Sequence, residues 1–152
     1  MSVTSDVKYW VNTVSKDHVS IGALGGFCQA CHGKAAPLKK MKPGDWIVYY
    51  SPKESFGGKE PCQKFTAIGQ IADSRIYQFD MGEGFIPFRR DVTYLNNIKE
   101  LPIRLLLSEL SFTKDRGPKW GAPFRFGLFT IPKEDFELIH QKMISKKRNL
   151  ET

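Results

Sequence analysis

Runs of apolar, aromatic and β-branched residues recur along the chain between polar turns, and they predict most of its strands. The clearest run extends from Trp46 to Ser51 after the turn residues of Lys-Pro-Gly-Asp, and it is too apolar for an exposed hairpin arm. Residues 52–62 are rich in proline and glycine and predict a loop. Further strands are predicted over residues 9–14, 65–71, 76–79, 85–94 and 124–131.

Helices are predicted where capping residues meet apolar positions at helical spacing. Acidic Glu134 and Asp135 fit the first turn of a final helix, where the helix dipole favours negative charge. Proline is tolerated in a first turn, so it marks helix starts rather than interiors. The predicted helices run from Ser15 to Gly22, over residues 34–41 with Pro37 near the start, over 102–110, and from Pro132 to the basic Lys146, Lys147 and Arg148.

About six strands with short helices between them do not show the strict alternation of a doubly wound parallel sheet. We therefore expect an α+β fold built on a small mixed β-barrel with flanking helices. The 152 residues contain 41% hydrophobic and 26% charged residues, which suffices for one packed core. Because no repeat or low-complexity linker interrupts the chain, residues 1–152 are expected to form a single domain.

Composition narrows the classes of partner. No run approaches the roughly 20 apolar residues that cross a bilayer, and the polar first residues do not resemble an export signal, so we expect a cytoplasmic protein without a membrane partner. Three cysteines, an odd number, argue against a disulfide framework. The net charge of +7 favours a polyanionic partner through neutralisation of phosphates.

The string Cys28-Gln-Ala-Cys31-His32 matches the attachment motif of c-type haem. Haem is not expected, because no export signal or axial ligand accompanies the motif. A zinc site with distant Cys62 would require the adjacent Cys31 and His32 to reach one tetrahedral ion, which structural zinc sites rarely do. The favoured interpretation is a packed turn, and we expect no cofactor or bound metal.

No catalytic constellation stands out. The histidines are scattered at positions 18, 32 and 140, and the GxSxG, HExxH and Walker A patterns are missing from the sequence. Cys28 beside His32 has the residue types of a nucleophile and base, without a third orienting group in the sequence. A non-enzymatic function is expected, and an enzyme or metalloprotein that uses Cys28, Cys31 and His32 is the alternative.

Aromatic residues near turns are interleaved with cationic ones. Such pairs stack unpaired bases and hold their phosphates in proteins that bind single-stranded nucleic acid. Most of these rings also fit strand patterns, so only two or three are expected to touch a ligand. The rings are Trp10, Phe27, Tyr49, Tyr50, Phe56, Trp120 and Phe126, and the cations are Lys34, Lys53, Arg89, Arg90 and Arg125.

Six segments, spread in order over nearly the whole chain, together match one known family. They are Tyr-Trp-Val-Asn-Thr-Val-Ser at 9–15, Gly-Gly-Phe-Cys-Gln-Ala-Cys-His-Gly-Lys-Ala-Ala-Pro-Leu at 25–38, Lys-Pro-Gly-Asp-Trp-Ile-Val-Tyr-Tyr-Ser-Pro at 42–52, Phe-Thr-Ala-Ile-Gly at 65–69, Pro-Phe-Arg-Arg at 87–90 and Phe-Arg-Phe-Gly-Leu-Phe at 124–129. With these segments the chain resembles the EVE domain family. That family is similar to PUA domains, which form a pseudobarrel with peripheral helices, and it is related to the YTH readers of methylated adenine in RNA. The resemblance implies a non-enzymatic domain that accepts one base of RNA or DNA, single-stranded or flipped and possibly modified, in a pocket beside the barrel.

Carried over by position, the resemblance implies a stacking role for Phe27, where the YTH relatives have a tryptophan. Phenylalanine keeps the stacking face but has no indole donor. Arg89 and Arg90 are adjacent, so on a strand they point to opposite faces and only one of them serves a given groove. The implied base-binding residues are Asn12, Thr13, Phe27, Cys28, Tyr50 and Ser51. From their charge, we expect Lys34, Arg89 and Arg90 to bind phosphate.

Overall fold

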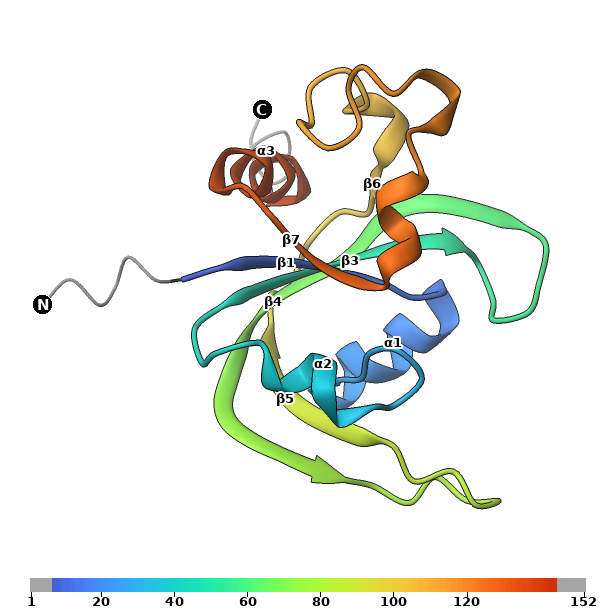
Figure 1. The fold of residues 1–152 in the computed structure, drawn as a ribbon, viewed down its shortest axis with the longest axis vertical. Helices are drawn as coiled ribbons and strands as arrows, with labels where there is room; N and C mark the ends of the chain where they lie inside the picture. The colour runs from blue at the N-terminus through green and yellow to red at the C-terminus, as the bar shows by residue number, and fades with distance from the viewer. Residues whose placement is uncertain (1–6, 145–152) are drawn as a thin grey trace, which may run out of the picture.

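The computed structural model of the chain describes residues 7–144 and has the predicted α+β class (Figure 1). Within these residues, seven strands form one sheet and α-helices pack against it. None of the helices in this range is long and apolar enough to cross a bilayer. In chain order, the elements are β1 (Tyr9–Thr13), α1 (Lys16–Gly25), β2 (Phe27–Cys28), α2 (Ala35–Lys39), β3 (Trp46–Lys53), β4 (Pro61–Gln78), β5 (Phe88–Tyr94), β6 (Leu101–Pro102), the 3-10 turns η2 (Ile103–Leu105), η3 (Gly117–Lys119) and η4 (Ala122–Phe126), β7 (Leu128–Ile131) and α3 (Lys133–Ile144).

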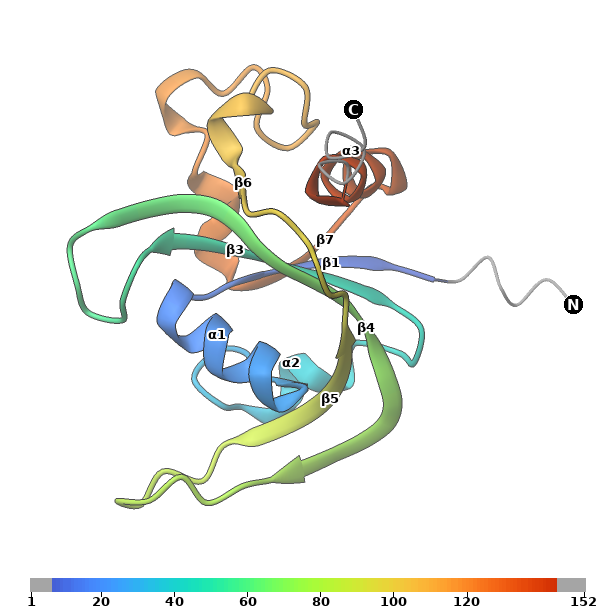
Figure 2. The same ribbon diagram turned by 180° about the vertical axis from the view of Figure 1, so that it is seen from behind.

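The sheet is curled and open. Its strand order is β2-β5-β4-β3-β1-β7, and β6 pairs with β4 outside this path. β1 and β3 run parallel, whereas the other neighbours are antiparallel. The long β4 bends so that β4 and β5 pass around α1 and α2 (Figures 1 and 2). The expected barrel is therefore only partly realised, because β2 and β7 end the sheet without pairing with each other.

Each face of the sheet carries its own core. Alternation along a strand sends successive side chains to opposite faces. On β3, Ile47 and Tyr49 therefore pack with α1 and α2, whereas Val48 and Tyr50 pack with α3 and the segment that contains the 3-10 turns. Figure 1 shows the two sets of helical elements on opposite sides of the strands. This split decides which predicted site residues can share a pocket.

Two of the predicted strands are a single element. Residues 65–71 and 76–78 both belong to β4, which continues through a register shift between Ile71 and Ile76 and ends one residue before the predicted end at Phe79. The residues between them are exposed and, apart from Ala72, polar, so they resemble a turn in the sequence. The carbonyl of Asp73 in this stretch accepts hydrogen bonds from Arg90 Nε at 3.1 Å and Nη2 at 2.8 Å. The bend is thus held by a side chain of the neighbouring strand.

The end of α1 differs from the predicted position, whereas the start of α3 agrees with it. α1 continues past Gly22 to Gly25 and ends at Gly26, whose φ of 77° needs the freedom of glycine. α3 begins directly after Pro132 with Glu134 and Asp135 in its first turn, as predicted. The basic end predicted for this helix, Lys146 to Arg148, lies outside the described residues.

The segments 102–110 and 124–131 are less regular than predicted. Ile103, Leu106 and Leu110 are fully buried at helical spacing, but their backbone forms a short 3-10 turn followed by hydrogen-bonded turns instead of an α-helix. Phe124 to Phe126 also belong to a 3-10 turn, and the strand starts only at Leu128, after Gly127 with φ of 78°. Alternating aromatics in this segment arise from a tight turn that buries Phe124 and exposes Phe126.

Candidate functional site

Tyr50 on β3 lies at the floor of an open hollow on the α3 side of the sheet. Its ring stacks on Phe124 at 4.1 Å between centroids and meets the edge of Phe65 at 5.7 Å. Burial raises the pKa of the Tyr50 hydroxyl well above its ordinary value, so the group stays protonated at neutral pH. Tyr50 is itself only 2% exposed, so its ring packs in the core beneath the hollow and its face is not free to stack on a ligand.

The walls of this hollow come from segments far apart in the sequence. The Arg104 guanidinium lies 5.6 Å from the centre of the Trp120 ring, and its Nε donates to Gln63 Oε1 at 3.2 Å. The volume of the hollow is about 380 Å³, within the roughly 300 to 1,000 Å³ of small-molecule sites. We call this feature the aromatic hollow, and it is lined by Tyr50, Pro52, Gln63, Arg104, Pro118, Trp120, Gly121 and Phe124.

The segment that supplies Trp120 is basic and exposed. Between residues 113 and 126 it contains a single acid, Asp115. Arg104, at the opposite wall, is also exposed. Positive charge beside an aromatic pocket attracts an anionic ligand such as the phosphate of a nucleotide. The exposed cations of the segment are Lys114, Arg116, Lys119 and Arg125.

Asn12 and Thr13, at the end of β1, point to opposite faces of the sheet. Asn12 is 1% exposed, and its Nδ2 donates to the carbonyl of Gln29 at 2.9 Å. Thr13 lies opposite Tyr50 in the parallel β1 and β3 pair, and its buried Oγ1 is without a partner among the described residues. Asn12 thus connects β1 to the turn after β2, and neither residue lines the aromatic hollow.

Ser51 and Cys28 are enclosed in the protein. The Ser51 hydroxyl is 2.8 Å from the Thr66 hydroxyl, and Ser51 is fully buried. Cys28 packs in the core on the α1 side, where burial raises its pKa to about 12. A thiol with that pKa is not a nucleophile at neutral pH. Cys28 therefore acts as a small packing residue.

The motif that suggested haem or zinc forms a left-handed turn. Cys31 and His32 have φ values of 50° and 65°, followed by Gly33 at 83°. Cys28 is buried, whereas His32 is exposed. Between residues 7 and 144, no three His, Cys, Asp or Glu side chains are grouped as metal ligands would be. This turn places Cys31 next to Gly127, so it contacts the end of η4.

The side chain of Arg89 packs directly against the ring of Phe27, which was not expected. The Arg89 guanidinium carbon lies 3.7 Å from the centre of the Phe27 ring and 4.0 Å from the centre of the Phe79 ring. The residue expected to bind phosphate thus covers the ring expected to stack on a base. We call this arrangement of Phe27, Arg89 and Phe79 the Arg89 slot.

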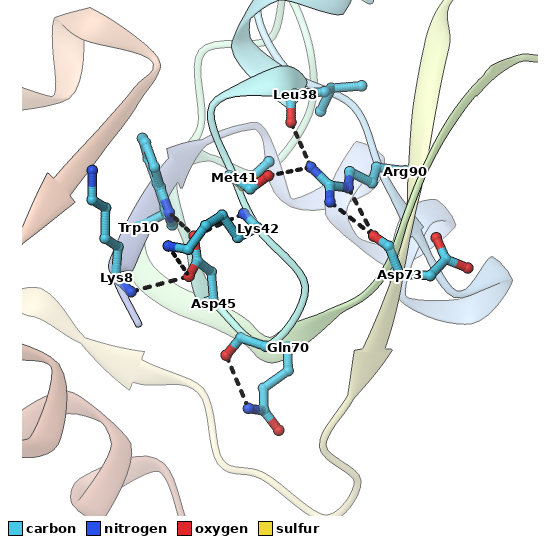
Figure 3. Close-up of polar contacts among 10 residues, drawn as sticks. Lys8, Trp10, Leu38, Met41, Lys42, Asp45, Gln70, Asp73 and Arg90 are labelled. Carbon is cyan, nitrogen blue, oxygen red and sulfur yellow. Dashed lines mark hydrogen bonds and ion pairs between the residues drawn. The ribbon is translucent and has the colours of Figure 1, made fainter. Parts of the chain in front are cut away.

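Arg90 points to the face of β5 opposite to Arg89, and its buried side chain binds backbone groups of the protein itself (Figure 3). Its Nη1 donates to the carbonyls of Leu38, at 2.8 Å, and Met41, and its other nitrogens donate to Asp73. The donors expected to face a phosphate are therefore taken up between α2 and β4. Lys34, the residue before α2, remains exposed.

The model of the EVE domain family matches residues 8–142. The chain belongs to the EVE domain family. A "UPF0310 protein in gntR 5'region" from Bacillus licheniformis is 49% identical to this EVE domain over 130 residues, covering 86% of this chain and 87% of the relative. A UPF0310 protein from Mycolicibacterium vanbaalenii is 50% identical over 136 residues, covering 90% and 92%. These names state no enzymatic activity.

Two solved structures share the fold of this EVE domain at low sequence identity. An NMR structure from Rhodopseudomonas palustris has a TM-score of 0.56 and 14% identity, and it covers 90% of this chain and 93% of that protein. A hypothetical protein from Leishmania major has a TM-score of 0.57 and 12% identity, with 95% and 98% covered. At these identities the likeness concerns the fold alone.

Of the residues expected to bind a base, only Tyr50 lines the aromatic hollow. Gln63, Arg104 and Phe124 were not among the expected residues. Trp120 was identified only as one of several rings near turns. The available signal was the run Gly117-Pro-Lys-Trp120-Gly121, in which an aromatic residue and a cation lie within a turn.

Proposed function

We propose that this EVE domain binds single-stranded or locally opened nucleic acid by taking one base into the aromatic hollow. The observation that carries the proposal is Trp120, a half-buried ring in the wall of the hollow, with the Arg104 guanidinium 5.6 Å from the centre of that ring. Stacking on aromatic side chains contributes roughly 1 to 3 kcal/mol per base. A volume of about 380 Å³ is large enough to accommodate a single base.

Polar groups at the walls supply the other contacts in this proposal. The Gln63 amide and the Tyr50 hydroxyl both donate and accept, so they suit the edge of a base. Arg104 and Lys119 are exposed beside the hollow and meet the phosphates on either side of the base. The role is non-enzymatic, since the lining contains no carboxylate, histidine or cysteine to carry out acid-base or nucleophilic chemistry.

The test is fluorescence anisotropy with labelled eight-nucleotide RNA and DNA strands of mixed sequence. Trp120→Ala is expected to weaken binding by roughly five- to 150-fold, the equivalent of one lost stacking contact. The matched control is Phe126→Ala, because Phe126 is a 73% exposed ring of the same segment that does not line the hollow. Equal affinities of Trp120→Ala and the unaltered protein, or an equal loss in Phe126→Ala, would contradict the proposal.

A further inference from the structure

Gln63 has a backbone conformation that is unusual inside a strand. Its φ of 54° lies in the left-handed region, which residues other than glycine rarely adopt. The pairing of β4 with β3 shifts register here, so that Cys62 and Gln63 face the single residue Pro52. An extra residue of this kind is a β-bulge, which turns a side chain out of the regular alternation and is common beside functional sites. The bulge places the Gln63 side chain in the wall of the aromatic hollow.

Arg104 fixes which end of the Gln63 amide is available to a ligand. The Arg104 Nε donates to Gln63 Oε1 at 3.2 Å. A guanidinium carries donors only, so it holds the amide oxygen and leaves the amide nitrogen unengaged. Gln63 Nε2 donates to no group within residues 7–144. The amide therefore offers two N–H donors to a ligand, while its acceptor is already engaged.

Arg104 is itself held by a ring of the hollow. Its guanidinium carbon lies 5.6 Å from the centre of the Trp120 ring, within the roughly 6 Å of a cation–π contact. Arg104 thus connects the ring that forms the stacking wall to the amide of Gln63. No aspartate or glutamate is among the residues that line the hollow, so no carboxylate competes for these donors there. A base in the hollow therefore meets hydrogen-bond donors at this wall.

We propose that Gln63, positioned by Arg104, selects bases that present a carbonyl group, namely uracil, thymine and guanine, over the amino bases cytosine and adenine. An unconstrained glutamine reads adenine with both ends of its amide, the oxygen accepting from N6 and the nitrogen donating to N7. That pairing needs the oxygen that Arg104 occupies. An amino group that faces the amide nitrogen sets donor against donor and weakens binding, whereas a carbonyl oxygen accepts the hydrogen bond. This inference rests on the proposed function, because it takes the occupant of the hollow to be a nucleic-acid base.

The probes are labelled RNA strands of eight uridines and of eight cytidines, compared by fluorescence anisotropy. The two strands have the same length, charge and ring size, but uracil carries a carbonyl oxygen where cytosine carries an amino group. The unaltered protein is expected to bind the uridine strand roughly three- to tenfold more tightly, the equivalent of one hydrogen bond. Gln63→Glu keeps the shape of the side chain but has only acceptors, so it should reverse the preference in favour of cytidine.

A matched pair of variants separates the positioning role of Arg104 from its contact with phosphate. Arg104→Ala and Lys119→Ala each remove one exposed cation beside the hollow, so both should weaken binding of both strands. Only Arg104→Ala also releases the oxygen of the Gln63 amide, which can then turn either end toward the base. The preference for uridine should therefore fall below roughly twofold in Arg104→Ala and persist in Lys119→Ala.

Equal affinities of the unaltered protein for the two strands, or an unchanged preference in Gln63→Glu, would overturn the inference. A preference that Arg104→Ala and Lys119→Ala reduce alike would also overturn it, because the amide would then not depend on Arg104. Trp120→Ala distinguishes a failure of this inference from a failure of the proposed function. If the unaltered protein binds both strands equally and Trp120→Ala weakens both, only the selection of bases fails. If Trp120→Ala changes neither affinity, the hollow is not the binding site and both proposals fail.

Discussion

Two neighbouring arginines show how strongly position on a strand decides the role of a residue. Arg89 and Arg90 have the same chemistry, but alternation on β5 sends them to opposite faces. Arg90 donates to backbone carbonyls and so joins α2 to β4, an arrangement we call the Arg90 clip. Arg89 instead lies against aromatic rings, and its Nε has no hydrogen-bond partner among the described residues. Burial lowers the pKa of both guanidinium groups, but only Arg89 keeps a buried Nε without a hydrogen-bond partner among residues 7–144.

Phe27 contributes to stability through its packing. It is 9% exposed, and its ring packs against Gly25 and Arg89. Phe27→Ala is expected to lower the free energy of unfolding by about 3 kcal/mol, and Phe27→Leu by about 1 kcal/mol, because leucine keeps most of the volume. Urea denaturation measures both changes. The control is Phe56→Ala, which removes a 66% exposed ring and should change stability by less than about 0.5 kcal/mol.

Cys28 links stability to pH. Burial keeps its thiol protonated in the folded state up to a pKa of about 12, whereas the thiol of the unfolded chain ionises near its ordinary value of about 9. The unfolded state thus loses this proton first, and stability falls as pH rises from about 9 to about 12. Between about pH 8 and pH 10, Cys28→Ala should lose about 1 kcal/mol less stability than the unaltered protein. Denaturant curves with the same pH dependence in both proteins would refute this assignment.

At the scale of elements, short pieces of secondary structure are held by buried polar side chains. α2 has five residues, too few to be stable alone. Arg90 attaches it to the bend of β4, and the buried carboxylate of Asp45 secures the following turn by accepting from Lys42 N at 2.9 Å and Trp10 Nε1 at 3.0 Å (Figure 3). These contacts place α2 and β4 relative to β1 without a long helix or a disulfide.

Removing the Arg90 clip should therefore loosen several elements at once. Arg90→Ala leaves the carbonyls of Leu38, Met41 and Asp73 without this donor, and we expect a loss of about 3 kcal/mol in the free energy of unfolding. Hydrogen exchange should rise first at the amides of α2 and the β4 bend. Arg75→Ala is the control, because its side chain is 62% exposed and its ion pair contributes less than about 1 kcal/mol. Similar stability losses in the two variants would argue against a clip.

At the scale of the whole molecule, the local pattern predicted the strands with continuous apolar runs better than the turns between them. β3 and the start of α3 follow directly from an apolar run and from proline with acids in the first turn. The bend in β4 was missed because it depends on Arg90, a residue 17 positions away whose bond to Asp73 has no local signal. Segment 102–110 was misassigned because buried leucines at helical spacing also suit a series of turns.

The candidate site was harder to predict for the same reason. Tyr50, Gln63, Arg104 and Trp120 converge from four separate segments, and only the fold brings them together. The resemblance to the EVE family identified the correct fold, and the family model confirms the membership. It directed attention to Phe27 and Cys28, neither of which lines the aromatic hollow: Cys28 lies in the core on the α1 side, and Phe27 lies against Arg89.

The net charge of +7 predicts how the whole molecule should respond to salt. If Arg104 and Lys119 neutralise phosphates beside the hollow, each contact releases counterions, and the logarithm of the association constant falls by roughly 0.7 per contact for each tenfold rise in salt. Anisotropy titrations of an eight-nucleotide strand between roughly 50 and 200 mM salt measure this slope. Arg104→Ala and Lys119→Ala should each reduce it by roughly 0.7. Lys39→Ala should leave it unchanged, because this exposed lysine of α2 lies on the opposite side of the sheet. A flat titration, or a slope that responds to Lys39 and not to Arg104, would show that phosphate is not held beside the aromatic hollow.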